Sequence, residues 1–304
     1  MELLDELAEL CGNEKLPEKE KILIFDGNNI AFKNLFADIY ANPEDNEFFY
    51  LWRHQMLNDI FDKIKMFSPT KVIIAFDQKN SWRYGIYKYY KSNRKSSRDN
   101  SKIDFEKFFP IFDDFKSDIE DKLSNIYVID YPQAEGDDIV AVLAKHLSAN
   151  EVIVISSDKD FNQLLVNKNI KKFDPIKKKS IESINPELQL QIQILTGDKD
   201  DGIPPIRPRV GVKTAEKILN EGLEEFLQKE ENKELIKIYN RNKTLIDFNC
   251  IPNDLSKNII NTFTNYEIKE LDSLKILKFF TKHKLVQIMK RWKFEIYPII
   301  SKLK

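Results

Sequence analysis

The sequence predicts an α/β fold, with a mostly parallel sheet covered by helices on both faces and a smaller helical domain toward the C-terminus. Short β-branched or aliphatic runs recur in the N-terminal part, each long enough for a strand and too short for a helix. Segments with helical periodicity separate these runs, and such alternation is typical of parallel sheets. After about residue 185 the β-branched runs fade and the pattern becomes helical.

The predicted elements follow in chain order. Strands are expected at 21–25, 71–76, 125–129 and 151–155, and the clearest helices between them at 50–65 and 137–148. A lysine-rich stretch at 170–180 is expected to form a hairpin where the domains join. Helices are then expected at 188–197, 213–227 and 233–242. We therefore expect an N-terminal tail (1–20), an α/β domain (21–185) and a helical domain (186–304).

Composition and charge exclude several classes of protein. The 304 residues include 48 Lys and Arg against 49 Asp and Glu, so any polyanionic partner must bind to local basic patches. The 2 cysteines and 3 histidines are too scattered for a disulfide framework or a zinc site, which suits a reducing cytoplasm. We expect no secretory signal, and no apolar run approaches the roughly 20 residues of a membrane span. The sequence therefore predicts a soluble, cytoplasmic protein without membrane contacts.

Three of the predicted strands lead into aspartates. Asp26 and Asp77 follow the first two strands, and Asp158 and Asp160 follow the fourth. Because the carboxyl ends of parallel strands share one edge of a sheet, where ligands bind, these side chains are expected to meet there. Taken singly, each acid has a structural explanation as a turn or loop residue. Their joint placement at one edge predicts a site.

Two further acidic groups belong to this prediction. Glu135, Asp137 and Asp138 lie where a helix begins after the third strand, and Asp198 and Asp201 open the helical domain. At about 4 Å and an effective dielectric constant near 20, each close pair of carboxylates costs about 4 kcal/mol. Several such pairs would rival the free energy of folding, so the cluster requires divalent cations. Ligands that are all oxygen select hard ions such as Mg²⁺ or Mn²⁺.

Two basic segments are candidates for binding nucleic acid. Residues 79–98 carry lysines and arginines without a single acid and with aromatic residues between them, a pattern that suits phosphates and bases. The alternative is a solvated helix whose aromatic side chains face the core. A glycine turn at 210–214 comes before a predicted helix, whose N-terminal N–H groups suit a phosphate oxygen. The expected contacts are Arg83, Lys88, Tyr90, Lys95, Arg98, Arg209, Gly211, Lys213 and Thr214.

The ordered series of motifs resembles the flap endonuclease or 5′-nuclease family, most closely its phage-type ribonuclease H members. The similarity spans nearly the whole chain. Each motif alone is unspecific, but their order and spacing together are specific. The series is FDG at Asp26, FD at Asp77, YYKSNR at 89–94, EGDD at 135–138, SSDKDF at 156–161, TGDKDD at 196–201 and VGVKTAEKIL at 210–219.

The resemblance implies a fold and a site. The fold would be a PIN-like three-layer α/β/α sandwich with a basic arch segment at 79–125 and a helix-three-turn-helix motif in the helical, DNA-binding domain. The site would hold two Mg²⁺, for which Mn²⁺ is expected to substitute. Lys91 and Arg94 would contact the scissile phosphate, and Asp137 would share the catalytic role. The implied metal ligands are Asp26, Asp77, Glu135 and Asp137 around one ion, Asp158, Asp160, Asp198 and Asp201 nearer the other, and Asp138 in the same motif as Asp137.

The resemblance also implies an activity. A metal-dependent 5′→3′ nuclease would hydrolyse phosphodiesters near the 5′ ends of RNA·DNA hybrids, nicked or gapped duplex DNA and flaps, and so remove RNA primers in lagging-strand replication. We expect a monomer, in the host cytoplasm if a phage encodes it, with a sliding clamp or a single-strand DNA-binding protein as further partners. Two alternatives stay open: a PIN-type single-strand ribonuclease, which would not need the TGDKDD loop, and a non-catalytic module that binds DNA junctions.

Overall fold

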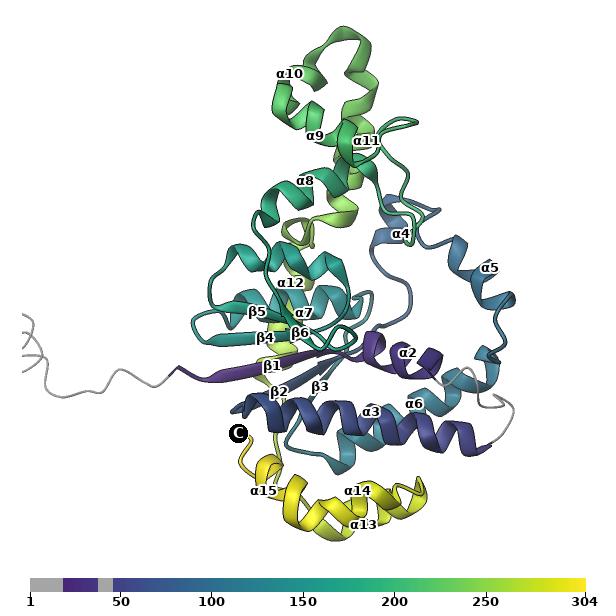
Figure 1. Cartoon of the computed structure of the whole chain (residues 1–304), viewed down its shortest axis with the longest axis vertical. Coiled ribbons are helices and arrows are strands. Elements are labelled where there is room, and N and C mark those ends of the chain that lie inside the picture. The colour runs from purple at the N-terminus through teal and green to yellow at the C-terminus, as the bar shows by residue number, and fades with distance from the viewer. Residues whose placement is uncertain (1–18, 38–45) are drawn as a thin grey trace, which may run out of the picture.

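The computed structural model describes residues 19–37 and 46–304, so nearly all of the predicted tail (1–20) lies outside the described residues. One sheet has the strand order β3-β2-β1-β4-β5-β6 (Figure 1). Strands β1 to β5 are parallel, and β6 pairs antiparallel with β5. This confirms the mostly parallel sheet and places the lysine-rich hairpin at its edge. The strands are β1 (Lys21–Asp26), β2 (Lys71–Ala75), β3 (Tyr127–Ile129), β4 (Glu151–Ile155), β5 (Ile170–Asp174) and β6 (Lys179–Ile181).

Helices cover both faces of the sheet, which explains why the central strands are apolar on both sides. Leu23 and Phe25 of β1 pack against α2 (Gly27–Ala37), α3 (Asn46–Phe67) and α6 (Phe105–Lys122). Ile22 and Ile24 face the other way and pack against α7 (Gly136–His146) and α12 (Asn253–Thr264). The result is the expected three-layer α/β/α sandwich.

Strand β1 passes directly into α2 at Gly27. A Cβ atom at this position would lie 2.8 Å from the carbonyl oxygen of Ala75 and 2.5 Å from the ring of Phe76. Only glycine therefore allows α2 to start beside strand β2, and this tight turn fixes the direction of Asp26, the last residue of β1.

A helical projection stands away from the sheet (Figure 1). Its helices share an apolar cluster that is separate from the two layers of the sandwich and that includes Tyr90. Tyr90 comes from the segment 79–125, which contains α4 (Arg83–Ile86), α5 (Asn93–Asp99) and α6 and runs from the projection down the side of the molecule. The helices of the projection are α8 (Pro186–Thr196), α9 (Val212–Glu221), α10 (Leu223–Gln228), η2 (Glu230–Asn232) and α11 (Lys233–Ile246).

The remaining C-terminal helices return to the sandwich. Helix α12 packs on one face of the sheet, as described above. Phe279 and Ile288 belong to the apolar cluster on the opposite face, together with β1, α3 and α6. Helical periodicity in the sequence does not reveal which surface a helix covers, so this packing is not part of the prediction. Among the helices of residues 19–37 and 46–304, none is long and apolar enough to cross a bilayer. The elements not yet given are η1 (Lys159–Val166), η3 (Phe248–Cys250), α13 (Ser273–Lys282), α14 (Val286–Arg291), η4 (Trp292–Ile296) and α15 (Tyr297–Ile300).

Candidate metal centre

Four carboxylates gather at the carboxyl edge of the sheet. Asp26 ends β1, Asp77 follows β2, Asp158 follows β4, and Asp137 lies in the first turn of α7. All four line one cavity of about 240 Å³. The carboxyl ends of the parallel strands therefore bring together acids that are far apart in the sequence, as predicted from their positions after the strands.

Backbone and hydroxyl donors hold two of these carboxylates in place. Asp26 accepts hydrogen bonds from the backbone N–H of Asn29 and the hydroxyl of Ser156, each at 2.9 Å. Asp77 accepts one from the backbone N–H of Gly136 at 2.7 Å. Since Gly136 starts the helix that carries Asp137, this bond ties the second strand end to α7.

The electrostatics of the cavity fit hard divalent cations. Burial, with smaller contributions from Asp77 and Asp158, raises the pKa of Asp26 to about 7. Burial and the nearby Asp26 and Asp158 raise the pKa of Asp137 well above its usual range. Without compensating charge these side chains hold protons at a pH where isolated aspartates are ionised. A buried set of carboxylate oxygens suits Mg²⁺ or Mn²⁺ rather than a soft metal.

A second acidic group adjoins the first. Gln193 of α8 donates to Asp160 at 2.7 Å and to Asp198 at 3.0 Å, so it bridges the start of η1 and the loop after α8. Burial, with a contribution from Asp158, raises the pKa of Asp160 to about 7. Gly197 shapes the second loop, because its φ is 69° and a Cβ there would lie 2.3 Å from the carbonyl oxygen of Ile203.

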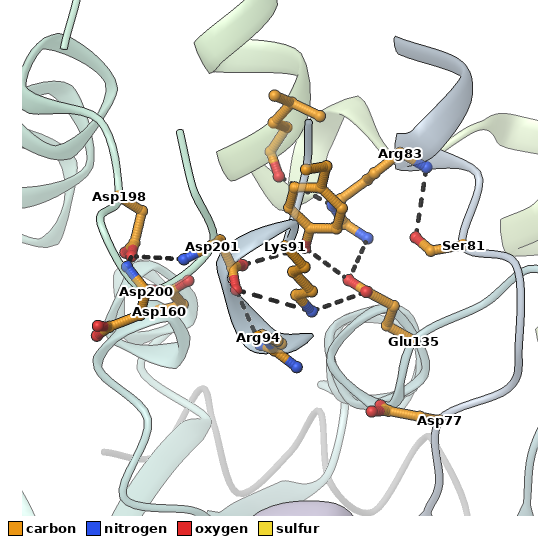
Figure 2. A network of polar contacts seen from close by, with 12 residues as sticks. Asp77, Ser81, Arg83, Lys91, Arg94, Glu135, Asp160, Asp198, Asp200 and Asp201 are labelled. Atoms are coloured by element: carbon orange, nitrogen blue, oxygen red, sulfur yellow. Dashed lines mark hydrogen bonds and ion pairs between the residues drawn. The ribbon is translucent and has the colours of Figure 1, made fainter. Parts of the chain in front are cut away.

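The predicted cationic pair lies between the two acidic groups (Figure 2). The Nζ atom of Lys91 is 2.7 Å from Glu135 and 3.9 Å from Asp201, and a nitrogen of Arg94 is 2.8 Å from Asp201. Both cations line the cavity together with the four carboxylates. They also line a larger hollow of about 710 Å³ on the side of the arch segment.

Glu135 and Asp138 differ from the predicted pattern. Lys91 and Arg83 hold the pKa of Glu135 below its usual value, although burial opposes them. Its oxygens accept from Lys91, Arg83 and Tyr90, and it does not line the smaller cavity. Asp138, whose side chain is 0% exposed, forms an ion pair with Arg83 and completes a capping box with Glu135. The structure thus places Asp138 with Arg83 and not among the residues that line the smaller cavity.

Two of the predicted nucleic-acid contacts bind the protein itself in this structure. Arg83 and Tyr90 are buried, and both bind Glu135 instead of facing the solvent. The Tyr90 hydroxyl lies 2.9 Å from Glu135 and 3.0 Å from Asp201, so it connects the start of α7 with the loop after α8. Since charge and aromatic content do not reveal burial, the sequence could not separate these residues from their exposed neighbours.

The other predicted contacts are accessible where their side chains are described. Lys88 and Arg98 are exposed, and the Arg98 guanidinium lies over the rings of Phe105 and Phe109. The side chain of Lys95 lies outside the described residues. On the helical projection, the glycine turn comes directly before α9, as predicted. Arg209, Gly211 and Lys213 are exposed there, Thr214 is half-buried, and none of these four lines either cavity.

Several neutral residues that support the site were not predicted. Asn28 donates to Asp77 at 3.0 Å and accepts from its backbone N–H at 3.0 Å. Asn29 accepts from the backbone and the hydroxyl of Ser157. The signal that could have found them is the pair of asparagines directly after Gly27 at a strand end, because short amide side chains favour such turns.

Another acidic group lies away from the sheet edge. Asp114, Asp118 and His283 have ligand atoms within 4.8 Å of one another. However, Lys282 lies 3.3 Å from Asp114 and 2.6 Å from Asp118, and His283 is 2.6 Å from Asp118. Lys282 of α13 thus already supplies a cationic partner to both aspartates and joins α13 to α6.

Comparisons with known proteins confirm the resemblance. Residues 21–188 match the model of the 5′-3′ exonuclease N-terminal resolvase-like domain, and residues 183–293 match that of the C-terminal part of T4 RNase H. Ribonuclease H of Enterobacteria phage T4 is 30% identical over 293 residues, which cover 87% of this chain and 92% of that protein.

Solved structures share the fold. A zinc-bound 5′-exonuclease of phage T5 has a TM-score of 0.63 at 18% identity, over 81% of this chain and 99% of that one. A flap endonuclease of bacteriophage T5 in complex with DNA and metal ions has a TM-score of 0.62 at 19% identity, over 89% and 99%. With two family models that follow one another along the sequence, and with strand-end acids gathered around one cavity, the chain belongs to the 5′-3′ exonuclease family of nucleases.

Proposed function

We propose that the protein is a metal-dependent 5′→3′ nuclease that hydrolyses phosphodiesters near 5′ ends in RNA·DNA hybrids, nicked or gapped duplexes and flaps, for primer removal in replication. The observation that carries this proposal is the joint lining of one cavity by four carboxylates and by Lys91 and Arg94. The carboxylates supply ligands for cations, and the two basic side chains supply charge for a phosphate. Together they suit hydrolysis of a phosphodiester better than simple binding.

Two divalent cations are assigned to the acidic groups. Asp26, Asp77 and Asp137 would hold one, and Asp160 and Asp198 the other, with further oxygens from the adjoining acids Glu135, Asp158 and Asp201. When bound, such ions neutralise the carboxylates, polarise the phosphate and lower the pKa of water. Mg²⁺ and Mn²⁺ both suit these ligands.

Lys91 and Arg94 act on the substrate. Both are now paired with carboxylates, Lys91 with Glu135 at 2.7 Å and Arg94 with Asp201 at 2.8 Å. A phosphate in the cavity offers them new acceptors, and their charges stabilise the negative charge that develops on its oxygens. The carboxylates that they leave remain partly compensated, Glu135 by Arg83.

The nucleic acid would extend along both basic segments. The exposed Lys88 and Arg98 of the arch segment contact the strand that enters the larger hollow. On the helical projection, the exposed Arg209 and Lys213 and the free N–H groups at the start of α9, next to Gly211 and Thr214, contact the duplex backbone. No described element reads bases, so junction shape and backbone contacts select the substrate.

Three 5′-labelled substrates test the proposal: a flap, a nicked duplex and an RNA·DNA hybrid, each with Mg²⁺ or with chelator. We expect cleavage near the 5′ end only with metal, leaving 5′ phosphate and 3′ hydroxyl ends. Asp137→Asn should abolish cleavage and leave affinity for the nicked duplex intact, whereas Asp113→Asn, at an exposed position on α6, should change neither. Cleavage in chelator, no cleavage of any substrate, or a preference for unstructured single strands would refute the proposal.

A further inference from the structure

Arg83 is a buried cation near the start of the arch segment, in α4 (Figure 2). Its side chain is 3% exposed. Its guanidinium pairs with both oxygens of Asp138, at 2.8 and 2.9 Å, and with Glu135 at 3.1 Å. Its Nε donates to the carbonyl oxygen of Leu245 at 2.9 Å. One planar group thus binds three acceptors from two distant parts of the chain.

The contact with Leu245 lies at the C-terminal end of α11. Carbonyl groups in the last turn of a helix have no partner within the helix, and a cation there also interacts favourably with the helix dipole. Arg83 binds the carbonyl of Leu245, and Gln163 of η1 donates to that of Ile246 at 3.2 Å. The end of α11 is therefore fixed from two sides, by residues that adjoin the two acidic groups.

The contacts with Glu135 and Asp138 lie at the start of α7. Glu135 is the N-cap of this helix, and Asp77 accepts from the backbone N–H of the next residue. The Trp82 ring lies 4.6 Å from the Arg83 guanidinium, and its indole N–H donates to Asp138. The guanidinium is thus fixed in its plane, and it determines where one oxygen of Glu135 lies.

We propose that Arg83 is a positioning residue that orients Glu135 at the metal centre and joins it to helix α11 of the helical projection. Because Glu135 keeps Arg83 as a partner, Lys91 can leave it for a phosphate without exposing an unpaired buried carboxylate. The part played by Lys91 rests on the proposed function, whereas the orientation of Glu135 does not. Lysine cannot replace this arginine, since a single ammonium nitrogen cannot meet three acceptors in one plane.

The decisive variant is Arg83→Lys, which keeps the charge and removes the planar geometry. Its matched control is Arg53→Lys, at a second buried arginine that lies on α3 among Tyr50 and Phe115. Titration calorimetry with Mn²⁺ alone, without nucleic acid, measures the metal site. Cleavage of a nicked duplex in Mg²⁺ gives kcat and KM, and thermal unfolding shows that each variant is folded.

We expect Arg83→Lys to weaken Mn²⁺ binding by about tenfold and to lower kcat by about tenfold or more, as for other residues that orient metal ligands, with KM nearly unchanged. Arg53→Lys should leave all three values at those of the wild type. Mn²⁺ affinity at the wild-type level in Arg83→Lys overturns the inference, whatever the rate of cleavage. If the wild type cleaves nothing, the proposed function fails, but the Mn²⁺ titration still decides the role of Arg83.

A second variant covers the case in which Arg83→Lys does not fold. Trp82→Leu leaves the arginine in place and removes both the aromatic face beside its guanidinium and the indole hydrogen bond to Asp138. Weaker Mn²⁺ binding by several-fold, with KM unchanged, would support the inference. Wild-type Mn²⁺ affinity in this variant would overturn it.

Discussion

Replacing Asp26 by asparagine removes one of the charges that the smaller cavity concentrates. Asp26 is 4% exposed, and Asp77 and Asp158 add their repulsion to the effect of burial. In the metal-free protein, the ionised form of Asp26 therefore opposes folding. We expect Asp26→Asn to make the metal-free protein more stable at pH 8 and to abolish cleavage, because asparagine is a weaker ligand for hard cations.

The magnitude follows from the pKa. Its rise from 3.8 to about 7 corresponds to roughly 4 kcal/mol at alkaline pH, at about 1.36 kcal/mol per unit. Asparagine has one acceptor oxygen where Asp26 has two, so one of the bonds from Asn29 or Ser156 is lost, at about 1 to 1.5 kcal/mol. The net gain at pH 8 is roughly 2 to 3 kcal/mol.

The sign of this effect depends on pH. Because the folded pKa lies above the unfolded one, the wild type gains stability when the folded state takes up a proton, and it loses this stability as the pH rises through about 7. At about pH 5 folded Asp26 is largely protonated, so the advantage of asparagine should nearly vanish. Urea unfolding in chelator at both pH values measures the difference, with exposed Asp113→Asn as the control. A variant less stable than the wild type at pH 8, or equally stabilised at both pH values, would refute the reasoning.

Three further predictions concern the cations of the site and a buried histidine. Lys91→Ala should lower kcat by about 10²- to 10³-fold, as for other donors to a charged transition state, whereas exposed Lys88→Ala should have a much smaller effect. Single-turnover cleavage of a nicked duplex compares the two variants. Equal losses would contradict the assignment of Lys91 to the scissile phosphate. Mg²⁺ at about 100 times its Kd should stabilise the protein at pH 8 by about 2.7 kcal/mol per site, so an unfolding midpoint that does not respond to Mg²⁺ would show that the acids bind none. Burial lowers the pKa of His283, so the unfolded state binds more protons and the protein should lose stability as the pH falls below the ordinary histidine value. His283→Gln should flatten this loss in thermal unfolding between pH 7.5 and 5.5; an unchanged slope would assign it to other groups.

The sheet and its acidic edge could be predicted because both leave local signals. Strands buried on both faces are short unbroken apolar runs, and each of the central ones appears in the sequence as such a run. The acids after β1, β2 and β4 are adjacent to those runs, so a single topological rule brings Asp26, Asp77 and Asp158 together. Asp137 followed because the start of a helix after a parallel strand faces the same edge.

Burial within residues 79–98 could not be predicted, because the partners are distant. Arg83 contacts Glu135 and Asp138 across 52 and 55 positions, and the carbonyl of Leu245 across 162. A backbone carbonyl leaves no mark on composition or charge. Arg83 and the exposed Arg98 are therefore indistinguishable as sequence, although one binds the protein itself and the other remains open to a substrate.

The difference between arginine and lysine at this site gives a physical reason for the arrangement. Glu135 has two cationic partners, and their chemistry differs. The planar guanidinium of Arg83 binds a fixed set of acceptors, which suits a permanent contact, whereas the ammonium of Lys91 is a point charge on a flexible stem. Lys91 can exchange one acceptor oxygen for another without breaking a matched pair of hydrogen bonds. It therefore suits a cation that must change its partner from Glu135 to the phosphate. Exchanging the two residues, as Arg83→Lys with Lys91→Arg, conserves total charge and should still abolish cleavage. Activity in that double variant would show that net charge alone, and not the placement of each type of cation, governs the site.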